Sequence, residues 1–353
     1  MMKDIINNNI KDAWTLPSEY YTDESIFVKI KAIINEMWHF SAHESQLSEY
    51  KIIPINHSEG MMGESIILTR DGVINALSNV CTHRGMIINE NSSNKNVLKC
   101  GYHGRTFDLK GRMKNMPEFE GISNFPDSSD DLVKFSIERW NGILFTSIKK
   151  KEAPTWIKEL EERLSWMSIE NFKYDPTYHR SYDIKANWAL YVDNYLEGFH
   201  IPYVHSDLHN VLDYEGYETE LFEGGVLQIG IAKDGELSFD LPPESKDYGK
   251  KIAAYYYWIF PGLMMNFYPW GLSVNLVIPI SVNSTQIVYQ RYVSNEDMIG
   301  KGAGGDLDKV EQEDQGIVEA VQRGVSSLSY HRGRYSATME KGVHHFHKML
   351  TRI

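Results

Sequence analysis

The two cysteines of this 353-residue chain lie in two short loops, and each loop pairs one cysteine with one histidine. The first loop reads Cys81-Thr-His83-Arg-Gly and the second Cys100-Gly-Tyr-His103-Gly, with sixteen residues between His83 and Cys100. Each loop offers one thiolate and one imidazole, which is half of a four-ligand metal site. The glycines permit tight turns and let backbone N–H groups approach sulfur. The two loops therefore predict a single metal centre.

Two kinds of metal centre use two cysteines and two histidines. A structural zinc ion binds such ligands in a tetrahedron, but the single residue between Cys81 and His83 is a shorter gap than zinc sites usually have. In a Rieske [2Fe–2S] cluster two cysteines bind one iron and two histidines the other. The imidazoles raise the reduction potential to roughly −150 to +300 mV, so the cluster passes electrons to a stronger oxidant. We favour the Rieske cluster, bound by Cys81, His83, Cys100 and His103, with zinc as the alternative.

Composition and charge limit the class of protein and its partners. Hydrophobic residues make up 42% of the sequence and charged residues 24%, which is typical of a globular protein. The net charge of −12 argues against a nucleic-acid partner. It is compatible with a cationic substrate, although solubility explains it equally well. No targeting pattern opens the sequence, and two reserved cysteines leave none for disulfides, so we expect a cytoplasmic protein.

The apolar pattern divides the chain into three parts and predicts an α+β protein. Residues 1–40 contain a loose lead-in and an amphipathic helix from Glu24 to about Phe40 that packs on the last domain. Residues 41–150 contain short β-type runs and form a small all-β domain with the metal loops at its tip. Residues 151–353 form the second domain.

A run of 39 residues, 252–290, carries neither a charge nor a histidine. Prolines and glycines cut this run into pieces too short to span a bilayer, so we expect no membrane partner. It predicts a buried antiparallel sheet with strands near 252–260, 263–268, 272–280 and 285–293. Some of its aromatic residues are candidates for the wall of a substrate pocket, and they are Trp258, Phe260, Phe267, Tyr268 and Trp270.

Two histidines of the second domain are candidate metal ligands. The stretch 186–200 has helical spacing, and His200 shares a polar face with Glu197, one turn earlier. Pro202 is expected to end this helix, and His205 follows on the exit turn. By itself a pair of histidines five residues apart is a weak signal, because such a face is ordinarily exposed to solvent.

Asp314 supplies a third candidate ligand. Residues 306–326 predict a helix, and Asp314 falls in the middle of its apolar stripe. A buried, unpaired carboxylate costs several kcal/mol, so it needs a cation or strong hydrogen bonds. Backbone N–H groups are one solution. With His200 and His205 it would form the facial triad of a mononuclear Fe(II), which leaves positions open for O2. The apolar stripe consists of Leu307, Val310, Ile317, Val318, Val321 and Val325.

The sequence resembles the Rieske non-haem iron oxygenases, the ring-hydroxylating oxygenase α-subunit family, over most of its length. The matching segments are CTHRG with CGYHG, DNYLEGFHIPYVH, and EQEDQGIVEAVQRG. The resemblance implies a Rieske domain followed by a helix-grip catalytic domain, an antiparallel sheet with long helices, usually in a homotrimer. It assigns the iron to His200, His205 and Asp314. It also implies that Glu197, where many members carry aspartate, links the cluster of one subunit to the iron of its neighbour.

The resemblance also implies a reaction. Electrons would come from NAD(P)H through a separate reductase of flavin or ferredoxin type, because the chain has no dinucleotide motif. The segments FPGLMMNFYPWGLSVNLVIPI and GVHHFHKML resemble the branch that contains choline monooxygenase and enzymes that oxidise betaines and carnitine. We therefore expect a monooxygenase that hydroxylates a quaternary-ammonium or N-methyl compound next to nitrogen, with demethylation as one outcome. The alternatives are an aromatic ring-hydroxylating dioxygenase and a Rieske electron carrier without catalysis.

Overall fold

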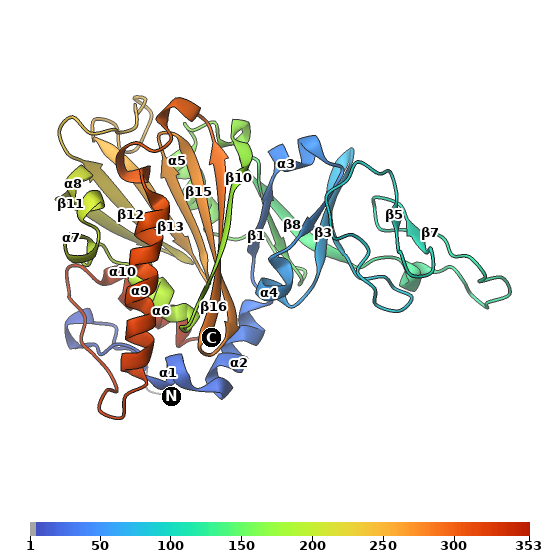
Figure 1. Ribbon diagram of the computed structural model, residues 1–353, viewed down its shortest axis with the longest axis horizontal. Helices are drawn as coiled ribbons and strands as arrows, with labels where there is room; N and C mark the ends of the chain where they lie inside the picture. The colour runs from blue at the N-terminus through green and yellow to red at the C-terminus, as the bar shows by residue number, and fades with distance from the viewer. Residues whose placement is uncertain (1–4) are drawn as a thin grey trace. The chain divides into compact units, whose positions relative to one another are not determined.

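The computed structural model describes residues 5–353, which form two compact units (Figure 1). The sequence predicts boundaries after residues 40 and 150, whereas the chain enters the smaller unit at Ile34 and leaves it after Ala153. The helix predicted from Glu24 to about Phe40 ends at Ile34, because His39–His43 pairs as a strand instead. The smaller unit comprises residues 34–153 and 169–173, and the larger unit 5–33, 154–168 and 174–353.

Two antiparallel sheets form the smaller unit, as predicted for an all-β domain. The first has the order β1-β9-β8-β4-β3-β2 and the second β5-β6-β7. Short helices α3 (Glu44–Glu49) and α4 (Ser58–Met62) follow β1 and β2. The strands are β1 (His39–His43), β2 (Ile52–Ile55), β3 (Ile66–Asp71), β4 (Val73–Ser78), β5 (Leu98–Lys99), β6 (Thr106–Phe107), β7 (Met113–Asn115), β8 (Lys134–Trp140) and β9 (Ile143–Ser147).

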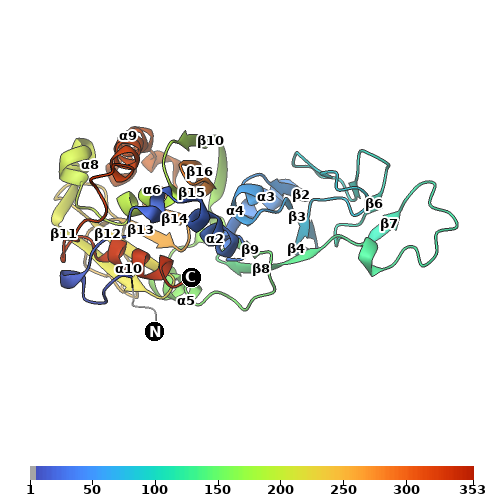
Figure 2. The ribbon, with the colours of Figure 1, turned by 90° about the horizontal axis from the view of Figure 1, so that it is seen from below.

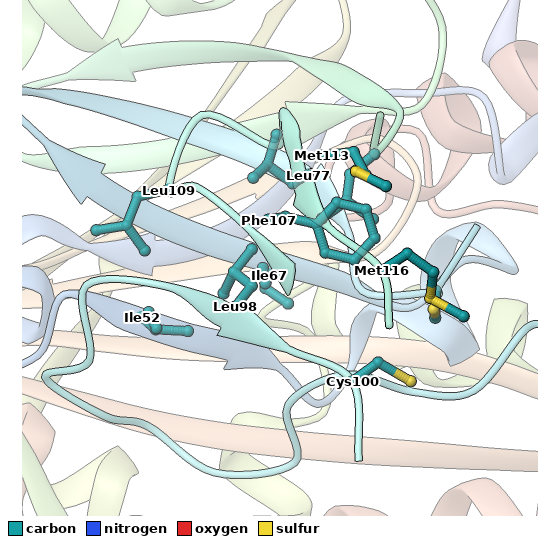
Figure 3. Close-up of a cluster of buried hydrophobic side chains, with 11 residues drawn as sticks. Ile52, Ile67, Leu77, Leu98, Cys100, Phe107, Leu109, Met113 and Met116 are labelled. Carbon is teal, nitrogen blue, oxygen red and sulfur yellow. The ribbon is translucent and has the colours of Figure 1, made fainter. Parts of the chain in front are cut away.

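A cluster of buried side chains joins the two sheets of the smaller unit (Figure 3). Ile67 and Leu77 come from the larger sheet, and Leu98 and Phe107 come from the small one. Full burial of each such side chain contributes about 1.5–3 kcal/mol to the stability of the folded state. Cys100 lies at the edge of this cluster, so the first residue of the second metal loop packs against the hydrophobic core.

The larger unit is built on a seven-stranded antiparallel sheet in the order β10-β16-β15-β14-β13-β12-β11. The four strands predicted within the uncharged run are confirmed as β13 to β16, and most of their residues are buried. The strands are β10 (Lys173–Ile184), β11 (Leu212–Phe222), β12 (Gly225–Ala232), β13 (Ile252–Ile259), β14 (Leu263–Tyr268), β15 (Gly271–Ser281) and β16 (Ser284–Val293).

Helices cover one face of this sheet. Helix α6 (Trp188–Tyr195) packs between α9 (Leu307–Val325) and strand β15, and α10 (Lys341–Leu350) packs on β11 and β12 (Figures 1 and 2). The α+β class expected from the sequence is confirmed. Within residues 5–353, no helix combines the length and the apolar character needed to cross a lipid bilayer.

Helix α9 agrees with the predicted range and with four of the six residues of the predicted apolar stripe, since Val318 and Val325 are buried and Leu307 and Val310 line the cavity described below. Ile317 and Val321 are 41% and 42% exposed, so they do not face the core. The prediction was wrong at these two positions, because a stripe drawn from apolar residues alone leaves out the polar side chains that share the inward face. The inward face repeats at intervals of three and four residues, and it carries Glu311, Asp314, Val318, Gln322 and Val325.

Candidate metal centres and active-site cavity

His200 and His205 flank a short helix rather than following a long one. The predicted helix over 186–200 ends at Tyr195, and Pro202 lies in the first turn of α7 (Ile201–Val204) instead of ending α6. The carboxylate of Glu197 accepts hydrogen bonds from the backbone N–H groups of Phe199 and His200. These bonds compete with continuation of the helix. His205 then separates α7 from α8 (Ser206–Val211).

The three candidate iron ligands come together as predicted. Nε2 of His205 lies 3.0 Å from Oδ1 of Asp314 and 3.2 Å from Nε2 of His200. The distance between Nε2 of His200 and Oδ1 of Asp314 is 3.5 Å. Adjacent ligands at about 2.1 Å from one ion lie about 3 Å apart, so one cation fits among the three atoms. Two histidines and one carboxylate are the donor set of a mononuclear Fe(II) site.

Two further carboxylates form hydrogen bonds with the Nδ1 atoms of these histidines. Nδ1 of His200 donates to Oε1 of Glu197 at 2.7 Å, and Nδ1 of His205 donates to Oε2 of Glu313 at 2.8 Å. Each bond keeps the proton on Nδ1 and leaves the Nε2 lone pair for a metal. Burial lowers the pKa of His205, but Asp314 and Glu313 outweigh it and raise that pKa overall. Glu313 was not predicted from the sequence, although its position next to Asp314 was a usable signal.

The predicted cluster ligands also converge, at the tips of two similar turns. Cys81 and Cys100 are buried, and the rings of His83 and His103 lie with their centroids 4.8 Å apart. Each turn closes with a backbone bond to the cysteine carbonyl, from Gly85 to Cys81 at 2.9 Å and from Gly104 to Cys100 at 3.2 Å. Both glycines have positive φ, near +72° and +76°, where other residues are strained.

The chemistry of these side chains fits a Rieske cluster. Both cysteines are free thiols, and burial followed by the neighbouring Cys100 raises the pKa of Cys81. Bound iron would offset the destabilisation of the buried thiolate, since metals bind the thiolate form. Desolvation, and then the charges of His103, Arg105 and Arg84, lower the pKa of His83, which favours the neutral imidazole that a metal ligand requires.

Arg105 links the two metal loops and was not predicted from the sequence. Its Nη1 donates to Oγ1 of Thr82 at 2.7 Å and pairs with Asp130 at 3.2 Å. Its guanidinium lies over the rings of Phe119 and Phe125, at 5.7 and 5.4 Å from their centroids. No spacing rule reveals this role, because the partners are far apart in the sequence.

A cavity lies beside the triad and is lined by His200, His205 and Asp314 together with residues of the sheet. The cavity has a volume of about 90 Å³. Its polar wall includes Gln228, Asn266 and Asn275. Its aromatic wall consists of tyrosines, and they are Tyr191, Tyr195, Tyr217, Tyr256 and Tyr268.

Of the five aromatic residues predicted for the pocket, the structure places only Tyr268 in the cavity wall. Trp270 stacks on Tyr268, with centroids 5.2 Å apart, and does not line the cavity. Phe267 alternates to the opposite face of β14. Trp258 and Phe260 pack on Phe346 of α10, which covers that part of the sheet. The prediction failed because composition does not reveal which end of a strand a helix covers.

Comparisons with known proteins give a consistent result. Residues 169–353 match the family described as ring hydroxylating alpha subunit (catalytic domain), and residues 37–126 match the Rieske [2Fe-2S] domain. The chain is 30% identical to chloroplastic choline monooxygenase of Arabidopsis thaliana, over 97% of this chain and 83% of that protein. It is 29% identical to the carnitine monooxygenase oxygenase subunit of Escherichia coli (strain K12), over 98% and 95% of the two chains.

Solved structures show the same similarity. A quaternary ammonium Rieske monooxygenase, described with insights into carnitine oxidation and inter-subunit electron transfer, has a TM-score of 0.83 at 25% identity, over 99% of this chain and 98% of that one. A Rhodococcus naphthalene 1,2-dioxygenase bound to indole has a TM-score of 0.74 at 17% identity, over 96% and 94%, and this likeness shows the fold alone.

Proposed function

Because the chain belongs to the ring-hydroxylating oxygenase α-subunit family, we propose that it is the oxygenase component of a quaternary-ammonium monooxygenase. It uses O2 and electrons to hydroxylate a small substrate at a carbon next to nitrogen. The choline and carnitine monooxygenases similar to this chain act, by their names, on two compounds that each carry a trimethylammonium group. The observation that carries the proposal is the tyrosine-lined cavity directly beside the triad of His200, His205 and Asp314.

The residues of the chain have separate roles in this reaction. His200, His205 and Asp314 would hold Fe(II), which supplies O2 binding and activation, and the two Cys/His loops would hold the cluster that supplies electrons. Glu197 and Glu313 keep the Nδ1 protons in place, so both imidazoles present Nε2 toward Asp314.

The tyrosines provide a surface for a substrate cation. The rings of Tyr256 and Tyr268 lie 5.9 Å apart at 79° and form a corner of the cavity. A desolvated ammonium against each ring face gains roughly 0.5–2 kcal/mol. A trimethylammonium group has no N–H donor, so ring faces hold it without leaving a hydrogen bond unmade. Tyr268 thus keeps its predicted role, and other tyrosines take the role predicted for Trp258, Phe260, Phe267 and Trp270.

Electron supply and assembly follow from the same proposal. A separate NAD(P)H reductase of flavin or ferredoxin type delivers electrons to the cluster. We propose a homotrimer in which the carboxylate of Glu197 accepts a further hydrogen bond from a cluster histidine of the neighbouring subunit. The support is the position of Glu197 behind His200 and the inter-subunit transfer described for a similar protein. The free cysteines suit a reducing cytoplasm.

The test is a product screen with purified protein and a surrogate reductase. Choline, L-carnitine, glycine betaine and naphthalene are supplied separately with NADH and O2, and products are identified by mass spectrometry. We expect an oxidised or demethylated product from at least one trimethylammonium compound, with O2 consumed in proportion. Dihydroxylated naphthalene together with no product from any ammonium compound would replace the proposal with aromatic dioxygenation.

A further inference from the structure

Glu311 places a second carboxylate in the cavity, one turn of α9 before Asp314. Its Oε2 accepts hydrogen bonds from the hydroxyls of Tyr191 and Tyr289, and its Oε1 accepts one from Nδ2 of Asn275 at 3.2 Å. All three partners are neutral donors. The carboxylate is therefore held in place by hydrogen bonds, but none of these partners neutralises its charge.

A chain of hydrogen bonds across the cavity wall ends at this carboxylate. The hydroxyl of Tyr195 donates to Oδ1 of Asn266 at 2.6 Å, and Nδ2 of Asn266 donates to Oδ1 of Asn275 at 3.3 Å. This order turns the NH2 group of Asn275 toward Glu311. Each donor points toward the carboxylate, and such an arrangement favours its ionised form.

Burial opposes that ionisation. Burial, with a contribution from the nearby Asp314, raises the pKa of Glu311 to about 7. The hydrogen bonds of the cavity wall thus hold in place a carboxylate whose ionised form is destabilised by burial. A cation in the cavity would stabilise that ionised form.

The cavity is lined by acidic side chains without basic ones to balance them, among the described residues. Its acidic side chains are Glu197, Glu311 and Asp314, and no lysine or arginine occurs among the described residues that line it. Asp314 belongs to the metal triad, and Glu197 accepts from His200. Glu311 is therefore the lining carboxylate that contacts neither histidine of the triad. A carboxylate on the substrate would find no basic side chain and would face Glu311 as a like charge.

We propose that Glu311 is a specificity-determining residue that pairs with the ammonium centre of the substrate, and that the preferred substrate is a cation without a carboxylate, such as a choline-type amino alcohol. This inference rests on the proposed function and narrows it. Zwitterions such as carnitine and glycine betaine are then poor substrates, because no basic side chain among the described lining residues can pair with their carboxylate.

Anaerobic calorimetry on the holoenzyme tests the pairing without turnover. Three probes are titrated: choline, L-carnitine, and 3,3-dimethylbutan-1-ol, which has the shape of choline but no charge. We expect choline to bind at least about tenfold more tightly than either of the others. Glu311→Gln should weaken choline binding by about tenfold and leave the neutral alcohol within about twofold of the wild type.

Glu162→Gln is the matched control. Glu162 pairs with exposed Lys158 on the surface of α5 (Ile157–Leu164) and does not line the cavity. This variant makes the same chemical change and should bind all three probes like the wild type. Glu311→Asp, which keeps the charge, should retain part of the preference for choline over the neutral alcohol.

The outcomes separate this inference from the function on which it rests. If carnitine binds as tightly as choline, or if Glu311→Gln leaves choline affinity unchanged, the inference is overturned while the proposed function stands. If Glu311→Gln does not fold, equal wild-type affinity for choline and its neutral isostere overturns it equally. If neither ammonium compound binds and the product screen yields only dihydroxylated naphthalene, the proposed function itself fails.

Discussion

The carboxylate of Glu313 accepts the Nδ1 hydrogen of His205 at 2.8 Å, while Nε2 of the same ring lies 3.0 Å from Asp314. One helix, α9, therefore supplies both the residue that would share a metal with His205 and the residue that orients the ring. Glu313 is only 28% exposed, so solvent screens this hydrogen bond incompletely. The arrangement makes the affinity for iron depend on a side chain that does not itself touch the metal.

Replacement of Glu313 by glutamine should weaken iron binding. The amide oxygen is a poorer acceptor, so Nε2 of His205 becomes less basic, and we expect a loss of affinity of about tenfold. Competition with a chelator, followed by measurement of the remaining iron, checks this. Glu319→Gln on the same helix is the control, because Glu319 accepts from the backbone of Lys185 instead. Equal iron retention in both variants would show that Glu313 has no orienting role.

Replacement of Glu197 by glutamine should separate metal binding from electron transfer. The glutamine can still accept from His200, so we expect both metal sites to be filled. It cannot carry the negative charge that a cluster histidine would meet, so oxidation of the reduced cluster should slow by at least about tenfold. Stopped-flow absorbance in a single turnover measures this rate. An unchanged rate would assign Glu197 to orienting His200 alone.

Replacement of Arg105 by leucine should loosen the two cluster loops. The change removes the bonds to Thr82 and Asp130 and leaves Asp130 without its cation. We expect unfolding to become easier by about 1–3 kcal/mol, with earlier loss of the cluster absorbance on heating. Arg112→Leu is the control, because Arg112 pairs with Asp108 at the surface. Identical melting curves for the two variants would contradict the bridging role.

His43 should make the smaller unit sensitive to acid. Nε2 donates to the carbonyl of Ile169, and Nδ1 accepts from the backbone N–H of Ser45, so protonation would break the second bond. Burial lowers the pKa of His43 to about 4, although the bond to Ile169 and the charge of Glu170 oppose the shift. Between the ordinary value of 6.5 and about 4, the unfolded chain binds the extra proton. Stability is therefore complete above pH 6.5 and is lost as the pH falls.

This group alone should remove about 1.4 kcal/mol of unfolding free energy for each pH unit below 6.5, until the folded pKa is reached. Denaturant unfolding at several pH values measures the slope. His43→Asn keeps an acceptor at the start of α3 but cannot titrate, so its slope in this window should be smaller. Parallel slopes for the two proteins would show that His43 does not cause the acid sensitivity.

The sequence predicted well what is local or strictly periodic. The cluster ligands lie within loops of a few residues, and the four central strands follow from an uncharged run broken by turn residues. His200 and His205 were also found locally, although the helix before them ends five residues early because the carboxylate of Glu197 binds the next backbone N–H groups.

What the sequence did not predict depends on long-range packing. Glu311 and Glu313 were missed because the phase of α9 was read from an apolar stripe that included exposed Ile317 and Val321. Of the cavity tyrosines only Tyr268 was predicted. Tyr256 was missed because α10 covers one part of β13 and leaves another open, and Tyr191, Tyr195 and Tyr217 were missed because they lie outside the uncharged run.

Metal analysis of the wild type and Asp314→Ala tests the central claim, that one chain holds a Rieske cluster and a separate mononuclear iron. The wild type, prepared anaerobically, should contain about three iron atoms and about two acid-labile sulfides per chain. Asp314→Ala should keep about two of each, with an unchanged cluster spectrum and no turnover. Zinc without sulfide in the wild type, or three iron atoms and full activity in the variant, would contradict the account.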